Sequence, residues 1–294
     1  MLLATRQAAG MACPSCGHAR HFVSGRRIGC TRCNRRWTIT AGTVMADTKL
    51  PLTTWFRAMH LMSATKQAIS AVELGRRLGV GYATAWYLHK RLRHAMRERE
   101  AGRQLGAPVG DGVPGGDGAG GTGLLVEADD IYLGGERNQG RGTAGKTRMI
   151  AACERSSTGR MGQVAMQVVD GFTTKAVKAF CTQHIAPAAQ VHTDGLAAFN
   201  AFGEAGRDHL STPTGGRRPG RERGAAFFTI NTLIANLSTA FKATHKTLSP
   251  KHLPDYLGAF WTTNRRRHMT TMIPACCRAV AASTRLTRRS VYAT

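Results

Sequence analysis

The spacing of apolar side chains changes along this chain. From residue 51 to about residue 98, apolar positions recur every three or four residues, the period of amphipathic helices. The pattern predicts a helix after Pro51, a short helix over about 70–78, and a longer basic helix from about Tyr82 to Met96. A Gly-Val-Gly sequence between the second and third of these predicts a tight turn.

Beyond residue 124 the pattern becomes that of strands. Three apolar segments, a helical segment, a fourth apolar segment ending in His-Thr-Asp and a further helical segment follow one another. This β-β-β-α-β-α order predicts an α/β domain of the RNase H-like type, in which the first and fourth strands are neighbours. Residues 106–123 contain nine glycines and two prolines, which predicts a flexible linker before that domain. A second glycine-rich stretch, 213–224, is expected to form a basic loop.

The charge of the chain indicates the class of its partner. Lys and Arg number 41 and Asp and Glu 17, giving a formal net charge of +24, while the 42% apolar content suffices for a core. Such an excess attracts polyanions, most often nucleic acid. Residues 1–105 alone carry a net charge of +14. A solvated basic surface, or a protein of the ribosomal type, is the alternative that charge by itself leaves open.

In this setting, the short helix, glycine turn and basic helix favour a helix-turn-helix, although other basic helical hairpins share the pattern. We expect the basic helix to lie in the major groove of DNA, with contacts from Lys90, Arg91 and Arg93. Arg35 and Arg36 lie near a cysteine pair in the sequence and are expected to contact phosphates.

Four of the eight cysteines form two closely spaced pairs. Cys13 and Cys16 form one CxxC, Cys30 and Cys33 form another, and 13 residues separate the pairs. Each CxxC can turn two thiolates towards one ion, so the double spacing predicts a tetrahedral zinc site in a zinc ribbon. A single CxxC would also fit a redox motif, but the second copy at ribbon spacing disfavours it. The remaining cysteines show no ligand spacing and are expected to be ordinary core or surface residues.

Hydropathy argues against association with a membrane. No apolar run approaches the roughly 20 residues that span a bilayer, and the first residues do not fit a secretory signal. We therefore expect a cytoplasmic protein, in whose reducing surroundings paired cysteines are more often metal ligands than disulfides.

Carboxylates in an apolar strand are unexpected in so basic a chain. Glu127, Asp129 and Asp130 lie within the first predicted strand of the α/β domain, and Asp194 ends the fourth. Because these strands are expected to be neighbours, Asp129 and Asp194 should meet. Carboxylates held in this way can bind two divalent ions, Mg²⁺ or Mn²⁺, for phosphoryl transfer to DNA. Taken singly, Asp129 could be a solubilising edge-strand acid and Asp194 a helix N-cap.

At this point the sequence resembles the ISXO-like family of bacterial insertion-sequence transposases, which combine a zinc ribbon, a helix-turn-helix and a DDE-type RNase H-like domain. The resemblance covers nearly the whole chain and depends on motifs such as CPSCGH…CTRCNRRW, VEADDIYLGG, HTDG, INTLIANL, SPKHLPDYL and TNRRR. It implies a multidomain protein with a zinc ribbon at 1–45, a helix-turn-helix domain at 46–105, the linker at 106–123, a catalytic domain at 124–275 and a basic tail at 276–294.

The resemblance also implies the catalytic set. Asp129 would be the first acid and Asp194 the second, and Asn231 would stand where the family has Glu or Asn, with Asn236 as the other candidate. The sequence departs from the family pattern at Ser238, at Ala243 and around Ala259, where Lys, Gly and Glu are usual, respectively.

The expected function is DNA transposition. The chain would bind element ends and target DNA as a homo-oligomer, with structural Zn²⁺ and catalytic Mg²⁺ or Mn²⁺, and would cleave and join DNA. The alternative, which the departures keep open, is an inactive transposase derivative or a DNA-binding regulator.

Overall fold

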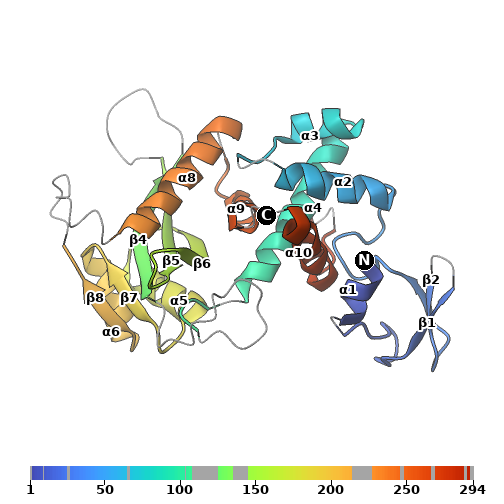
Figure 1. The fold of residues 1–294 in the computed structure, drawn as a ribbon, viewed down its shortest axis with the longest axis horizontal. Coiled ribbons are helices and arrows are strands. Elements are labelled where there is room, and N and C mark those ends of the chain that lie inside the picture. The colour runs from blue at the N-terminus through green and yellow to red at the C-terminus, as the bar shows by residue number, and fades with distance from the viewer. Residues whose placement is uncertain are drawn as a thin grey trace. The chain divides into compact units, whose positions relative to one another are not determined.

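The computed structural model describes most of the chain (Figure 1). The described residues are 2–8, 10–24, 27–64, 67–102, 104–107, 125–134, 145–213, 227–245, 248–265, 269–287 and 290–291. Most of the predicted linker and of the predicted loop at 213–224, and the expected ribbon turn at Gly25, lie outside them. Contacts divide the chain into a first unit, Met1–Glu100 with Asp255–Thr294, and a second unit, Ala101–Pro254.

The first unit begins with a short helix and a small antiparallel sheet. Helix α1, Leu2–Ala8, precedes the strands β1 (His21–Ser24), β2 (Arg27–Cys30) and β3 (Arg36–Thr38), which pair in sequence order. Ile28 lies opposite Trp37, and both are buried with the first cysteine of each CxxC pair. The sheet therefore has a very small apolar core of its own, in which cysteines take part.

The remainder of the first unit is helical. Helices α2 (Leu52–Ser63), α3 (Ala71–Leu78) and α4 (Tyr82–Ala101) confirm the three predicted from the sequence. Ser70 caps α3 by accepting a hydrogen bond from the Glu73 amide, and Gly79 ends it in the left-handed conformation that glycine adopts without strain. Apolar faces of α2, α3 and α4 meet in one core.

Two helices from the end of the chain complete this core. Helix α9 (Leu253–Arg265) begins at the boundary between the units, and α10 (Met269–Ala282) packs against α1 and α2. Met272 and Cys276 are buried beside Trp55 and Leu88. The sequence placed 124–275 in the catalytic domain, whereas in the structure residues from Asp255 onward belong with the first unit. Contacts between segments more than 150 residues apart leave no local pattern by which to predict them.

The second unit is a mixed five-stranded sheet between helices. The strands are β4 (Leu125–Leu133), β5 (Thr147–Arg155), β6 (Met161–Val169), β7 (Gln190–Thr193) and β8 (Asp208–Ser211), in the order β6-β5-β4-β7-β8. Strands β4, β5 and β6 are antiparallel, and β7 lies parallel to both β4 and β8. The expected contact between the first and fourth strands is thus confirmed.

Helices cover the two faces of this sheet. Helix α5 (Thr174–His184), the 3₁₀ turn η1 (Ala197–Asn200) and α6 (Ala201–Glu204) bury Phe180, Phe199 and Phe202 with the side chains of Val126 and Ala128. Helix α8 (Phe228–Thr244) contacts β4 and β5 and lies beside them in Figure 1. Because strand side chains alternate between faces, α8 covers the face to which the odd-numbered residues of β4 point.

The start of the predicted linker is part of the second unit. Leu105 exchanges backbone hydrogen bonds with His184 and Ala186, and the Gly106 amide donates to the Glu154 carboxylate at 2.9 Å. Gly106 has a φ of +73°, and a Cβ there would lie 2.4 Å from that of Ala189, so the position requires glycine. Among the described residues, no helix is long and apolar enough to cross a membrane.

Candidate functional site

Strand pairing brings the predicted carboxylates together. The parallel register of β4 and β7 runs from Leu125 and Gln190 to Ala128 and Thr193, so that Asp129 comes next on β4 and Asp194 directly follows the end of β7. Carboxylate oxygens of Asp129, Asp130 and Asp194 all lie within 4.8 Å of one another. The predicted meeting of Asp129 with Asp194 is therefore observed, and Asp130 joins them.

Local hydrogen bonds orient two of the three side chains. Oδ1 of Asp129 accepts from the Asp130 amide at 2.9 Å, and Oδ1 of Asp194 accepts from the Leu196 amide at 3.2 Å. The second bond makes a turn directly after β7 and does not cap a helix, since η1 starts one residue after Leu196. Asp194 thus faces Asp129 at the point where β7 ends.

The electrostatics of the cluster favour a cation. Burial, and then the charges of Asp194 and Asp130, raise the pKa of Asp129 to about 7, and burial with the charge of Asp194 also raises the pKa of Asp130. No Lys, Arg or His among the described residues forms an ion pair with any of the three carboxylates. A set of oxygen ligands without a counter-charge matches the preference of Mg²⁺ and Mn²⁺.

Glu127 has a different role, which the sequence did not reveal. Its side chain is fully buried on the face of β4 that also carries Asp129. One oxygen accepts from Arg155 at 3.1 Å, and the other accepts from the backbone amide of Ile230 at 2.9 Å. Ile230 lies in the first turn of α8, where amides have no partner within the helix. Glu127 therefore fastens the start of α8 to the strand of Asp129.

The sequence does contain a signal for this role. Glu127 and Asp129 are two residues apart on one strand, which places both on the same face of the sheet. Glu127 lies further inside the sheet than Asp129, where a side chain is buried. A buried carboxylate requires hydrogen-bond donors. The donors themselves, Arg155 and the Ile230 amide, lie 28 and 103 residues away in sequence.

Asn231, the predicted third ligand, follows Ile230 in the first turn of α8 and is exposed. Phe227, directly before that helix, packs on His192 of β7 with ring centroids 4.5 Å apart. The start of α8 is thus fixed to both strands that carry the aspartates. Asn236 is half-buried and lies one and a half turns further along α8.

The four cysteines of the CxxC pairs form a second potential metal site. Their sulfur atoms lie within 4.8 Å of one another, with 3.6 Å between Cys13 and Cys33 and 3.6 Å between Cys16 and Cys30. Backbone amides of Cys33 and Arg32 lower the pKa of Cys30 to about 7, which favours the thiolate that binds metal. This donor set fits zinc. The other four cysteines are buried in the cores, as expected.

The predicted DNA-contacting residues divide into two groups. Arg35 and Arg36 are exposed at the small sheet, and their contact with phosphates stays a prediction. Lys90, Arg91 and Arg93 of α4 are buried, with exposed fractions of 8%, 6% and 2%.

Each buried cation has a contact inside the first unit. Lys90 pairs with Asp255 at 2.5 Å, Arg91 donates to the Ala46 carbonyl at 2.6 Å, and Arg93 lies over the ring of Tyr256 at 3.6 Å. None of the three side chains lies on an open helix surface, and their contact with DNA stays a prediction. Asp255 and Tyr256 of α9 cover Lys90 and Arg93, on a face of α4 that reads as polar in the sequence, whereas Arg91 packs against Ala46 and Trp55.

Residues 119–261 match the family model described as the ISXO2-like transposase domain. No curated protein matches the chain.

Proposed function

Residues 119–261 belong to the ISXO2-like transposase domain family, and on this premise we propose that the chain is the DNA transposase of an insertion sequence. It would bind the ends of its element and catalyse metal-dependent DNA cleavage and strand transfer. The observation that carries the proposal is the cluster of Asp129, Asp130 and Asp194 on adjoining strands without a counter-charge among the described residues. The strand order around these aspartates supports an RNase H-like domain.

Asp129 and Asp194 would hold two Mg²⁺ or Mn²⁺ ions, with Asn231 contributing a side-chain oxygen and Asp130 lying beside them. When bound, such ions activate the attacking hydroxyl and stabilise the leaving oxygen of a phosphodiester. The contribution of the chain is to hold these oxygens in place. The strand pairing fixes the two aspartates, and Glu127 fixes the start of the helix that carries Asn231.

Binding of DNA would belong to the first unit. The cysteine cluster would hold one structural zinc ion, and α3 and α4, joined through Gly79, would form the helix-turn-helix. Exposed arginines of the small sheet, including Arg35 and Arg36, would contact phosphates. A homo-oligomer would bring two element ends together.

The second candidate is an inactive derivative that only binds DNA. The observations that favour it are the departures at Ser238 and Ala243 of α8 and at Ala259 of α9. Ala259 is buried in the core of the first unit, whereas the aspartates belong to the second. We favour the enzyme because a regulator has no need of uncompensated carboxylates on adjoining strands.

A strand-transfer assay tests the proposal. The full chain is incubated with Mg²⁺ or Mn²⁺ and labelled DNA that carries the sequences flanking its gene, beside the Asp194→Asn variant. We expect cleaved ends and joined products only with the parent protein and a divalent ion. Tight DNA binding without cleavage under any of these conditions would favour the regulator.

A further inference from the structure

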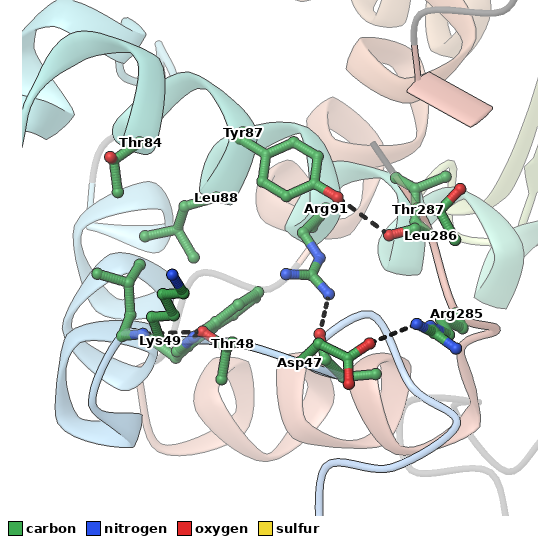
Figure 2. Close-up of a pocket in the computed structure, with 13 residues that line it drawn as sticks. Asp47, Thr48, Lys49, Thr84, Tyr87, Leu88, Arg91, Arg285, Leu286 and Thr287 are labelled. Atoms are coloured by element: carbon green, nitrogen blue, oxygen red, sulfur yellow. Dashed lines mark hydrogen bonds and ion pairs between the residues drawn. The ribbon is translucent and has the colours of Figure 1, made fainter. Parts of the chain in front are cut away.

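The first unit contains a cavity that the proposed function does not use (Figure 2). Its volume is about 490 Å³, and it is lined by residues of three segments: 46–50 with Trp55, one face of α4, and 285–287. Trp55, Leu88 and Ala46 are buried walls, whereas Lys49 and Arg285 are exposed at its edge. A volume in this range accommodates a nucleotide-sized group and exceeds what a lone ion requires.

A buried cation lines this cavity. Arg91 is only 6% exposed, and its guanidinium lies 5.1 Å from the ring centroid of Tyr87 and 5.4 Å from that of Trp55. It donates to the Ala46 carbonyl, while its Nε is buried without a hydrogen-bond partner among the described residues. No carboxylate in the described part of the chain forms an ion pair with it. Burial, the largest effect, lowers the pKa of Arg91, and the charge of Arg285 lowers it as well, whereas Tyr87 and Asp47 offset these effects only in part. A further anion would therefore stabilise the charge of Arg91.

The other charges around the cavity offset the charge of Arg91 only in part. Asp47 is its one acidic lining residue, and it pairs with Arg285 at 2.5 Å. Figure 2 shows this pair at one side of the cavity and Lys49 at another. Lys49 forms no ion pair with any described residue. With Lys49, Arg91 and Arg285 against Asp47, the lining has a surplus of two positive charges.

The uncharged lining indicates what accompanies the anion. Thr84 and Thr287 add hydroxyl groups, and Leu50, Leu88 and Leu286 add apolar surface. Cationic and hydroxyl donors suit phosphate oxygens, while the apolar surface suits a sugar ring. Thr84 lies in the first turn of α4, the helix proposed to bind DNA, so the cavity adjoins the proposed DNA-binding elements.

We propose that this cavity receives one phosphodiester group of a DNA strand together with the adjacent sugar, the phosphate being held by Arg91 and Lys49. The inference rests on the proposed DNA-binding function and specifies a contact for it. The strand would enter past the exposed edge formed by Lys49, Thr84 and Thr287. The bound phosphate would add to the counter-charge that Asp47 supplies only in part.

The salt dependence of DNA binding tests the proposal. The affinity of the full chain for a labelled duplex is measured by fluorescence anisotropy at several salt concentrations, for the parent, Lys49→Met, Arg91→Met and the double variant. Each phosphate contact adds about 0.9 to the slope of log affinity against log salt. Because both cations hold one phosphate, we expect the double variant to lose about 0.9 in total, not the roughly 1.8 of two separate contacts.

The control is Lys178→Met, which removes the same charge from an exposed pair with Glu204 in the second unit. It should leave the slope at the parental value. A double variant with the slope of this control would overturn the proposal, as would a loss of about 1.8. Since Lys49 is exposed, Lys49→Met keeps the test valid even where Arg91→Met fails to fold.

A second measurement separates this proposal from the proposed function. Binding of the dinucleotide dTpdT to the full chain is followed by ligand-observed NMR, with inorganic phosphate as the comparison probe and Lys49→Glu as the variant. We expect dTpdT to bind the parent and not Lys49→Glu, even where the parent shows no specificity for element ends. Binding of inorganic phosphate alone, or equal binding of dTpdT to parent and variant, would overturn the phosphodiester assignment.

Discussion

Asp129, Asp130 and Asp194 each make the charged state of the others more costly, because their oxygens lie within 4.8 Å of one another. The fold tolerates this repulsion because the strand pairing of β4 and β7 is determined elsewhere, by the buried neighbours of the aspartates. A divalent ion would turn the repulsion into coordination. The same residues should therefore affect stability in opposite directions without and with metal.

Asp194→Asn tests this reversal. Without divalent ions, the variant should melt at a higher temperature than the parent, by about 2–4 °C for each kcal/mol of repulsion removed. With Mg²⁺ or Mn²⁺, the parent should gain stability in proportion to ion binding and the variant should gain little. Differential scanning fluorimetry measures both effects. Equal stabilisation of parent and variant by the ions would contradict a role for Asp194 in binding them.

Asp129→Asn and Asp194→Asn should also abolish cleavage while DNA affinity stays near the parental value. The reason is that the aspartates belong to the second unit, whereas the proposed DNA-binding residues belong to the first. The strand-transfer assay and anisotropy measurements on the same protein samples check both statements. A parental cleavage rate in Asp194→Asn would exclude the two-metal mechanism.

The cysteine cluster should bind one zinc ion per chain. The small sheet has little core of its own, so metal binding would provide much of its stability. Cys13→Ser and Cys33→Ser should lose the zinc, as measured by metal analysis of the purified full chain. Ser15→Ala, in the same loop, is the control that keeps all four sulfur atoms and should keep the zinc. Full zinc occupancy in the two cysteine variants would remove the four-thiolate assignment.

At the scale of elements, single buried carboxylates connect segments that are distant in the sequence. Glu127 fastens α8 to β4, and Asp255 fastens α9 to α4 through Lys90, with Arg97 at 3.2 Å. In both cases the charge is buried and its partners belong to another element. Such connections fix the relative placement of elements because an unsatisfied buried charge is costly.

Glu127→Ala should release the start of α8 and with it Asn231. The variant removes the Glu127 carboxylate to which the Ile230 amide and Arg155 donate, which costs about 1–3 kcal/mol in the second unit. Cleavage should fall, and stabilisation by Mg²⁺ should weaken, with DNA affinity unchanged. Glu127→Gln keeps one acceptor oxygen and should restore part of the cleavage and part of the stabilisation by Mg²⁺. Glu204→Ala, at an exposed ion pair, is the control. Parental cleavage in Glu127→Ala would show that α8 needs no such anchor.

The Asp255 connection should appear in the pH dependence of stability. Burial alone would raise the pKa of Asp255, but hydrogen bonds from His94 and Lys90 and the charge of Arg97 hold it at about 2. A pKa below the ordinary value means that Asp255 stabilises the fold above pH ~4 and loses this contribution as the pH falls towards 2, in total about 2 kcal/mol. Urea unfolding between pH 7 and pH 2 measures it.

Asp255→Asn should remove that pH-dependent contribution. At pH 7 it should cost about 3–5 kcal/mol because the buried ion pair of Lys90 with Asp255 is broken while Lys90 keeps its charge. Glu73→Gln, which breaks the exposed pair with Arg77, should cost at most about 1 kcal/mol. Similar losses in the two variants would mean that the buried pair contributes no more than a surface one.

These connections also explain what the sequence could and could not predict. Local signals predicted α2, α3 and α4 and the strands β4 to β7, because helix caps and the spacing of apolar residues depend on residues that are close in the sequence. The meeting of Asp129 and Asp194 followed from the order of these elements. Strand β8 was not predicted, because it is four residues long and is mostly exposed at the sheet edge.

The burial of Lys90, Arg91 and Arg93 is the clearest failure of local reasoning. Three basic residues within four positions read as a solvent-facing helix surface. Their burial depends on Asp255 and Tyr256, more than 160 residues later, and on the Ala46 carbonyl. No periodicity in 82–101 indicates a partner at that distance. A lone Asp at the start of a late amphipathic helix gave no reason to pair it with α4.

At the scale of the whole molecule, the second unit is an insertion between two parts of the first. Residues 101–254 leave the first unit after α4 and return to it at α9. The two parts of the first unit are joined by hydrogen bonds as well as by ion pairs. The Val44 amide donates to Ser283 at 3.1 Å, Tyr87 donates to the Leu286 carbonyl at 3.2 Å, and Arg99 donates to that of Ala275 at 3.1 Å.

This arrangement changes the choice of fragment for studying DNA binding. A fragment of residues 1–105, which the sequence alone suggests, lacks α9 and α10 and would expose the core positions that Met272, Cys276 and Val280 cover. It would also leave Lys90 without Asp255. A chain in which residues 1–102 are joined to 253–294 by a Gly-Ser linker restores these contacts and omits the second unit.

We expect the joined chain to unfold cooperatively, and to bind duplex DNA with an affinity that falls steeply as salt rises, because released counterions drive the binding. The 1–105 fragment should show no cooperative transition. Each Å² of apolar surface that α9 and α10 no longer cover lowers its stability by about 25 cal/mol. Circular dichroism melting and anisotropy titrations of the two proteins make the comparison, and the joined chain with Asp255→Asn is the control for the connection itself. Cooperative unfolding of 1–105 at the temperature of the joined chain would show that the C-terminal helices are not part of this folding unit.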